Sequence, residues 1–327
     1  MFDFEKNCRC VITDSLKQRF CKDTNLTIKI FEEPYFSNSL ELYDEQYGAI
    51  AKYKRFVEAV DFFGDEQAYF EAYGNLKDRV IEYLNENEDM KYFSQQEDMN
   101  KFACQNKGFP TKDIFKETNE GKVFVSIDMV KGNFTALHHY NPNIVKGCDS
   151  YESFIGTFTD IPHFVESKYI RQVVFGNVNP KRQVTYEKYL MDKVLTKLLS
   201  FDEIKPEMVA FFSTDEIVLE VPDEYIDNGV VNGLFYDTVM DVVSWAKSYN
   251  INVRGEFFEL HKIPGTDGYV KKFLMHKDGV DFKCLDFMTM PFVLRAYKGE
   301  KPNVLDKVFM YEGKKVMLME DMTVKVV

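Results

Sequence analysis

Residues 209–221 read VAFFSTDEIVLEV, and this stretch decides the fold that we expect for the chain. Two apolar runs flank the polar tip Ser213-Thr214-Asp215-Glu216, a pattern that predicts a β-hairpin with both strands buried. Two adjacent carboxylates at such a tip have two explanations. They form either a solvated turn or a set of oxygen ligands for a metal ion.

A second stretch, residues 123–137, reads VFVSIDMVKGNFTAL and favours the metal site. Its β-branched, apolar first half predicts a strand that is buried on both faces and ends at Asp128. If this strand pairs with the hairpin, Asp128, Asp215 and Glu216 meet at one edge of the sheet. Clustered acids repel one another unless a cation lies between them, so the sequence predicts a divalent metal at this edge.

The order of the predicted elements indicates the fold class. After residue 115 the chain reads strand, helices, hairpin, helix, strand, which is typical of an α+β fold of the ferredoxin-like, split βαβ kind: an antiparallel sheet with helices on one face. Residues 1–115 are expected to be mixed and mostly helical, and Gly108-Phe109-Pro110 breaks the chain near their end. We therefore expect two domains, residues 1–115 and residues 116–327, the second with a strand-rich extension from about residue 265.

Composition and charge narrow the class of protein. The net charge of −12 argues against a protein that simply coats nucleic acid, but it leaves room for an enzyme with a local basic groove. The chain shows no signal-peptide pattern and no apolar run of membrane length, and its six cysteines are scattered, so we expect a cytoplasmic protein without membrane partners. The motifs of P-loop enzymes, dinucleotide-binding enzymes, zinc proteases and serine hydrolases are missing from the sequence.

The two stretches resemble the palm domain of template-copying nucleic-acid polymerases and related nucleotidyltransferases, over about residues 122–260. In that family one motif ends a strand in Asp and soon shows a bulky residue, as in Asp128 and Phe134, and a second is a hairpin with acids at its tip. The resemblance implies a palm-type sheet. It also implies Asp128, Asp215 and Glu216 as catalytic ligands of Mg²⁺ or Mn²⁺.

The same resemblance implies where the substrate binds. The backbone around Met129–Asn133, together with Lys131, is expected to hold the triphosphate. Asn133 or Phe134 is expected to lie under the sugar as a steric gate. Phe134 comes one residue later after Asp128 than the aromatic residue of many palms, which is a departure from the family pattern.

A basic segment between the two acidic motifs adds to this prediction. Palm polymerases place a helix with basic side chains here, to bind the incoming triphosphate and the template. A helix that starts at Asn179-Pro180 has an N-terminus that is suited to bind phosphate. The alternative is a solvated basic face that balances nearby acids. The candidate residues in this segment are Lys168, Arg171, Lys181, Arg182 and Gln183.

The leading hypothesis is a palm-type, metal-dependent nucleotidyltransferase or polymerase that extends a nucleic-acid or protein-primed 3′ end. Its partners would be nucleoside triphosphates and a nucleic-acid primer or template. The chain is small for a complete polymerase, so a protein partner or an oligomer belongs to the hypothesis.

Two alternatives stay open. Ser-Thr-Asp-Glu-Ile also resembles the Gly-Gly-Asp-Glu-Phe hairpin of nucleotide cyclases, which make second messengers on the same superfold, although the glycines are missing at positions 213 and 214. The other alternative is a non-catalytic accessory or structural protein of a virus or mobile element, in which the hairpin acids are simply solvated.

Overall fold

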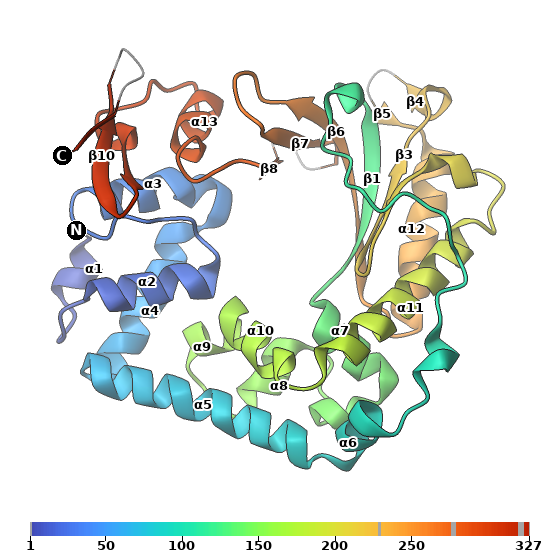
Figure 1. The fold of residues 1–327 in the computed structure, drawn as a ribbon, viewed down its shortest axis with the longest axis horizontal. Helices are drawn as coiled ribbons and strands as arrows, with labels where there is room; N and C mark the ends of the chain where they lie inside the picture. Colours follow the sequence, from blue (N-terminus) through green and yellow to red (C-terminus); the bar gives the residue numbers. More distant parts are fainter. Residues whose placement is uncertain (1, 228–229, 276–278, 320–323, 327) are drawn as a thin grey trace. The chain divides into compact units, whose positions relative to one another are not determined.

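The structure is a computed structural model that describes residues 2–227, 230–275, 279–319 and 324–326. It is an α+β fold, and its contacts divide the chain into two units (Figure 1). Unit 1 comprises residues 1–80, 155–174 and 285–327, and unit 2 comprises residues 81–154 and 175–284. This division does not coincide with the predicted boundary near residue 115. The reason is long-range packing: within unit 1, α9 (Pro162–Glu166) packs against α4 (Ala49–Phe63).

Unit 2 contains a six-stranded antiparallel sheet in the order β2-β3-β1-β6-β7-β8. The predicted buried strand and the predicted hairpin are both present, and they pair directly. The strands are β1 (Val123–Met129), β2 (Val209–Phe212), β3 (Glu216–Glu220), β6 (Val253–Lys262), β7 (Tyr269–Phe273) and β8 (Val280–Lys283). A short ladder of β4 (Ile226–Asp227) with β5 (Val230–Val231) stands beside this sheet.

Helices α11 and α12 cover one face of this sheet (Figure 1). Gly255 of β6 shows which face it is, because a Cβ at Gly255 would lie 3.3 Å from the Val243 side chain of α12. Ile127 is the partner of Gly255 in the ladder, so it belongs to the helix-covered face, whereas its neighbours Ser126 and Asp128 belong to the other face. The helices of unit 2 are α6 (Glu88–Gln95), α7 (Gly132–Tyr140), α11 (Pro180–Leu198) and α12 (Gly233–Ser248), with α8 (Tyr151–Gly156) and α10 (Lys168–Gly176) crossing the division between the units.

Local sequence explains why the two long helices begin where they do. The side chain of Asn179 accepts a hydrogen bond from the N–H of Arg182 and Pro180 occupies the first turn, so α11 starts at a strong cap. The side chain of Asn232 caps α12 in the same way, on the N–H of Phe235. The apolar stripe of α12 is buried as its spacing predicts, at Phe235, Val239, Val242, Val243 and Ala246.

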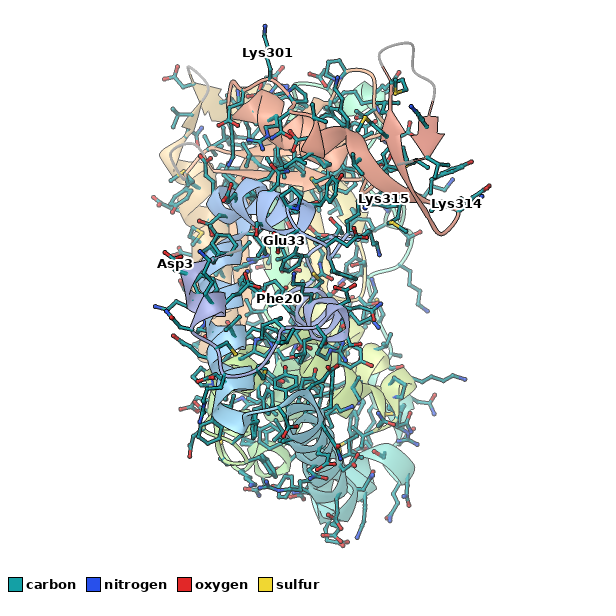
Figure 2. The ribbon with its side chains drawn as sticks, turned by 90° about the vertical axis from the view of Figure 1, so that its left-hand side faces the viewer. Asp3, Phe20, Glu33, Lys301, Lys314 and Lys315 are labelled. Atoms are coloured by element: carbon teal, nitrogen blue, oxygen red, sulfur yellow. The ribbon has the colours of Figure 1, made fainter. Side chains whose placement is uncertain are left out.

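Unit 1 is mostly helical and has an aromatic core. Figure 2 shows Phe20 among other side chains, whereas Lys301 and Lys314 point outward. Its helices are α1 (Asp3–Lys6), α2 (Asp14–Thr24), α3 (Tyr35–Tyr47), α4, α9 and α13 (Met290–Tyr297), together with the first part of α5 (Glu66–Glu86). Its sheet has the order β11-β10-β9, from β9 (Val308–Tyr311), β10 (Lys314–Leu318) and β11 (Val324–Val326). The predicted helical character of the N-terminal region is confirmed, since the described residues before 115 contain no strand.

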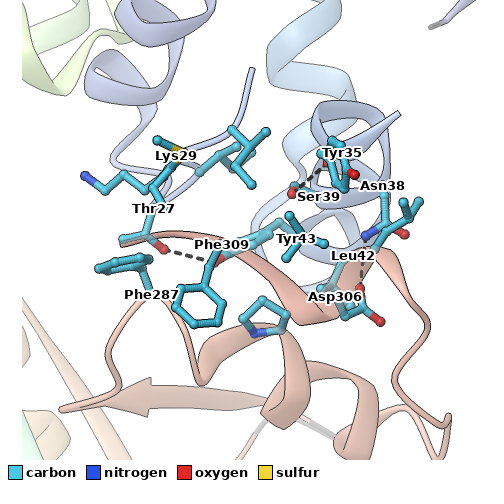
Figure 3. A pocket seen from close by; sticks show the side chains of 16 residues that line it. Thr27, Lys29, Tyr35, Asn38, Ser39, Leu42, Tyr43, Phe287, Asp306 and Phe309 are labelled. Atoms are coloured by element: carbon cyan, nitrogen blue, oxygen red, sulfur yellow. Dashed lines mark hydrogen bonds between the residues drawn. The ribbon is translucent and has the colours of Figure 1, made fainter. Parts of the chain in front are cut away.

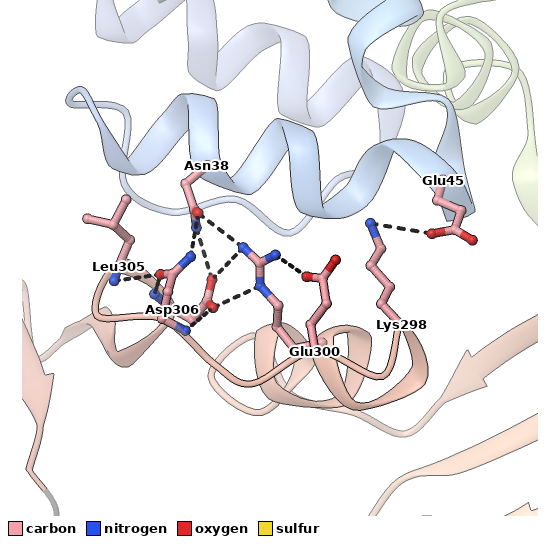
Figure 4. Close-up of polar contacts among 8 residues, drawn as sticks. Asn38, Glu45, Lys298, Glu300, Leu305 and Asp306 are labelled. Carbon is pink, nitrogen blue, oxygen red and sulfur yellow. Dashed lines mark hydrogen bonds and ion pairs between the residues drawn. The ribbon is translucent and has the colours of Figure 1, made fainter.

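A buried carboxylate ties α3 to the C-terminal segment of unit 1 (Figure 4). Asp306 accepts hydrogen bonds from Asn38 Nδ2 and from Arg295 Nε, each at 2.9 Å. A pocket of about 50 Å³ lies next to this network, where Thr27 and Tyr43 share a hydrogen bond of 2.9 Å (Figure 3). Ligand pockets usually measure about 300–1,000 Å³, so this one is too small for a nucleotide.

The strand-rich extension predicted from about residue 265 is split between the units: β7 and β8 widen the large sheet, and β9–β11 belong to unit 1. A two-residue turn at Glu312-Gly313 joins β9 to β10, and both residues have a positive φ, as such a hairpin turn requires.

Candidate functional site

Asp128 and Glu216 are opposed across β1 and β3, at the end of the large sheet where β1 stops and β3 starts. This end of the strands is called the acidic edge below. They are partners in the antiparallel ladder, so their side chains emerge on the same face, the one that α11 and α12 leave uncovered. The buried Ser126 hydroxyl donates a hydrogen bond to Glu216 Oε1 and fixes that carboxylate against the sheet. The predicted convergence of the two acidic motifs is therefore present for this pair.

Basic side chains from β6 and β7 face these acids. Arg254 is the ladder partner of Asp128, and its Nη2 atom lies 3.3 Å from Asp128 Oδ2. The same guanidinium lies 3.5 Å from Glu256 Oε1 through its Nη1 atom. Lys271 is almost fully buried and places its Nζ atom 3.7 Å from Glu216 Oε1. The edge thus holds a mixed group of charges in which acids outnumber bases.

The surroundings of this edge disfavour the charged forms of Asp128 and Lys271. Burial raises the pKa of Asp128 to about 6; Arg254 opposes this rise, and the neighbouring Glu216, Asp215 and Glu256 add to it. Burial also lowers the pKa of Lys271, against the influence of Glu216. A bound cation would relieve the repulsion among the acids, because it would favour their ionised forms.

Asp215 lies at the hairpin tip and is exposed. The Ser213 N–H donates to the Glu216 carbonyl at 2.9 Å and closes the turn, and the Ser213 hydroxyl donates to Asp215 Oδ1 at 3.2 Å. The ammonium of Lys188, from α11, donates to the Ser213 carbonyl at 2.9 Å and anchors the tip from below. The Asp215 carbonyl accepts a hydrogen bond from the Met129 N–H at 2.8 Å, so the tip lies beside the end of β1.

The three predicted metal ligands are neighbours but do not converge on one point. Among the residues that the structure describes, no group of three or more His, Cys, Asp or Glu side chains is close enough to hold a metal ion. Asp215 nevertheless lies near enough to contribute to the raised pKa of Asp128. A shared metal site therefore stays a prediction, for which the chain supplies carboxylates at one edge.

Glu187, on α11, is a site residue that the sequence reasoning missed. It is only 6% exposed, and burial raises its pKa to about 7, with Asp215 as the second cause. Its Oε1 atom has no hydrogen-bond partner among the described residues. Its spacing of four residues from Gln183 and three from Leu190 places it on the buried face of α11, and this spacing is the signal that the sequence offers.

The residues predicted to contact the triphosphate and the sugar have partners within the protein. Lys131, with a φ of 51°, precedes α7, and its ammonium pairs with Glu152. Asn133 Nδ2 lies 3.5 Å from Gln183 Oε1. Phe134 is buried, with its ring stacked on His138, so the structure gives this candidate gate residue a place in the core.

The predicted basic segment is divided between the units. Lys168 and Arg171 belong to unit 1, whereas Lys181, Arg182 and Gln183 belong to unit 2 with the acids. Arg182 Nη1 donates to the carbonyls of Phe93 and Glu97 at 2.9 and 2.7 Å. Gln183 is fully buried, and its Nε2 atom donates to the carbonyls of Phe175 and Val178. These contacts weaken the prediction that Arg182 and Gln183 bind phosphate, whereas Lys181 is exposed.

A separate cavity of about 480 Å³ lies between the C-terminal parts of α11 and α12. Its lining includes Tyr189, Lys193, Trp245 and Tyr249. The acids of the candidate site do not line this cavity, so it is not part of that site. These acids are Asp128, Asp215, Glu216 and Glu256.

Comparison with protein-family models, with curated proteins and with solved structures found no match for this chain. Across the described residues, no helix is long and apolar enough to cross a membrane. What the chain does is therefore inferred from the residues and the geometry of the acidic edge.

Proposed function

We propose that the chain is a palm-type, metal-dependent nucleotidyltransferase that adds nucleotides from nucleoside triphosphates to a 3′ end, in the cytoplasm. The observation that carries this proposal is the opposed pair Asp128 and Glu216, with Asp215 at the adjacent tip. The strand order β6-β1-β3-β2, with helices between β1 and β2 and between β3 and β6, supports it, because it is the order expected of a ferredoxin-like, split βαβ sheet.

The chemistry of the acids fits a hard divalent cation. Mg²⁺ and Mn²⁺ prefer oxygen ligands, and the edge offers carboxylates whose mutual repulsion contributes to the raised pKa of Asp128. Asp128 and Asp215 would hold the ion, with Glu216 as the third ligand, oriented by Ser126. When bound, such an ion activates the attacking hydroxyl and stabilises the leaving pyrophosphate.

The reaction forms one bond and breaks another. The 3′-hydroxyl oxygen bonds to the α-phosphorus while the bond from that phosphorus to the oxygen bridging to the β-phosphate breaks. Pyrophosphate leaves, and the hydroxyl proton passes to water. Arg254, beside Asp128, would bind a phosphate oxygen and keep Asp128 in place. The backbone at the start of α7 would receive the remaining phosphates.

The proposal is tested by incorporation of labelled nucleoside triphosphates with Mg²⁺ or Mn²⁺, with and without nucleic-acid primers. We expect wild type to make primer-dependent long products and Asp215→Asn to lose at least about 100-fold of this activity, because a metal ligand contributes several kcal/mol. Glu207→Gln, which removes an exposed carboxylate before β2, is the control and should retain activity.

Other products would point elsewhere. Short cyclic products that depend on Asp215 would favour the nucleotide cyclase. Absence of any product that depends on Asp215 would contradict the proposal and favour the non-catalytic accessory protein.

A further inference from the structure

Glu187 is a buried acid that the proposed reaction does not use. Its Oε1 atom lacks a hydrogen-bond partner among the described residues, although buried polar atoms are nearly always paired. The carboxyl group lies against the backbone of Gly132: a Cβ at Gly132 would be 3.4 Å from Glu187 Cδ and 3.6 Å from each carboxylate oxygen. Glu187 is therefore aimed at the first turn of α7.

That first turn has the character of an anion site. Helix α7 spans 9 residues, and within the described residues no side chain caps its N-terminus. The N-terminal N–H groups of a helix carry partial positive charge and bind phosphate readily. Lys131 comes just before them, but its ammonium is turned to Glu152. Free donors and an unpaired acid thus stand side by side.

A second acid lies nearby. The Asp215 carbonyl accepts a hydrogen bond from the Met129 N–H at 2.8 Å, and the ammonium of Lys188, next to Glu187 in α11, donates to the Ser213 carbonyl at 2.9 Å, so the hairpin tip lies beside both elements. Asp215 also contributes to the raised pKa of Glu187. Two carboxylates beside free N–H donors suit a ligand that carries both a cation and a phosphate. A phosphate alone would be repelled by the acids, and a cation alone would leave the donors unused.

We infer that Glu187 and Asp215 together bind a divalent cation at the N-terminus of α7, and that this cation brings the phosphates of a nucleoside triphosphate onto the N–H groups of that helix. This inference rests on the proposed function, whose substrate it binds. It adds a ligand from α11 to the acids of the two strands, and it gives the unpaired oxygen of Glu187 a partner.

The test measures Mn²⁺ affinity by titration. The protein is titrated with the metal alone, and then again with inorganic triphosphate present. We compare wild type with Glu187→Gln, which has nearly the same shape, with Glu187→Asp, and with the control Glu207→Gln. Glu187→Gln should weaken Mn²⁺ binding about tenfold or more, as expected when a metal site loses a supporting group. Glu187→Asp should recover part of the affinity, and triphosphate should bind with Mn²⁺ more tightly to wild type than to Glu187→Gln.

Unchanged Mn²⁺ affinity in Glu187→Gln would overturn the inference, and so would an equal loss in Glu207→Gln, which would indicate general charge. These outcomes leave the nucleotidyltransferase proposal standing, because that is measured by incorporation. Conversely, binding that depends on Glu187 without any incorporation would support the cation site and contradict the proposed reaction.

Discussion

Glu187 and Asp192 lie on the same helix, α11, and both are buried, at 6% and 4% exposure. Their surroundings differ. Asp192 accepts hydrogen bonds from the N–H groups of Gln105 and Asn106 at 2.8 and 2.9 Å, and a further one from Asn106 Nδ2 at 2.9 Å. Glu187 has an oxygen without any partner among the described residues.

The comparison separates an acid that holds the fold together from one that the fold alone does not explain. Burial works to raise the pKa of Asp192, but the hydrogen bonds from Gln105 and Asn106 outweigh it and lower the pKa. Burial raises the pKa of Glu187 to about 7, and no hydrogen bond offsets it. An acid that costs stability and is still buried at an acidic edge is expected to serve a ligand.

The largest effect should come from Asp192→Asn. This change replaces the carboxylate that accepts hydrogen bonds from the Gln105 and Asn106 N–H groups with a neutral amide. The NH₂ group of that amide cannot accept a hydrogen bond. We expect a loss of about 3 kcal/mol in the free energy of unfolding, since bonds to a buried charge are strong and their loss leaves donors unpaired. Urea denaturation measures it. A loss below about 1 kcal/mol would break the contrast between the two acids.

The matched change at the other acid, Glu187→Gln, should act in the opposite direction. At pH 8 the wild-type carboxyl is ionised in a buried place, and the amide is not. A pKa of about 7 against an ordinary 4.5 corresponds to a cost of up to about 3 kcal/mol; we expect a gain of about 1–2 kcal/mol, because the amide is also left without a partner. The measurement is urea denaturation of metal-free protein. Destabilisation at pH 8 would show that Glu187 has a structural partner.

The pH dependence of that gain sharpens the comparison. The pKa of Glu187 is raised in the folded state, so the folded protein binds the extra proton, and wild type loses stability as pH rises from about 4.5 to about 7. The gap between Glu187→Gln and wild type should therefore open across this window and be small at pH 4. A gap that is constant with pH would mean that ionisation of Glu187 is not its cause.

The smallest effect on stability is expected for Gly132→Ala. The added methyl group would lie 3.4 Å from Glu187 Cδ, an ordinary contact, and alanine favours a helix over glycine by about 0.5–1 kcal/mol. The unfolding free energy should change by less than about 1 kcal/mol. Mn²⁺ binding is the sharper measurement, because the methyl group would cover the Glu187 carboxyl group. Mn²⁺ affinity equal to that of wild type would place the cation elsewhere.

Much of the large sheet could be predicted from local patterns. The apolar run that ends at Asp128, the acidic hairpin tip and the stripe of α12 carry their own periodicity, and the order of elements led to the pairing of β1 with β3. That pairing brings Asp128 and Glu216 together. The sequence alone could therefore identify the acidic edge.

The remaining features depend on contacts between distant segments. Leu26, Ile28 and Ile30 alternate like residues of a strand, but they are buried in a segment that is part of no sheet among the described residues. Phe134 is buried, with the ring of Phe154 from a later segment 6.5 Å away between centroids, a neighbour that no local pattern reveals. Glu187 could not be recognised as unpaired without the positions of Gly132 and Asp215, which lie far from it along the chain.

The discontinuous build of unit 1 has a practical consequence for work on this protein. Because its three segments are separated by parts of unit 2, no single cut of the gene yields either unit whole. A fragment ending at residue 115 would keep α4 but lose α9, which packs on it. Binding and activity are therefore best measured on the full chain, and changes within it should be point substitutions rather than truncations.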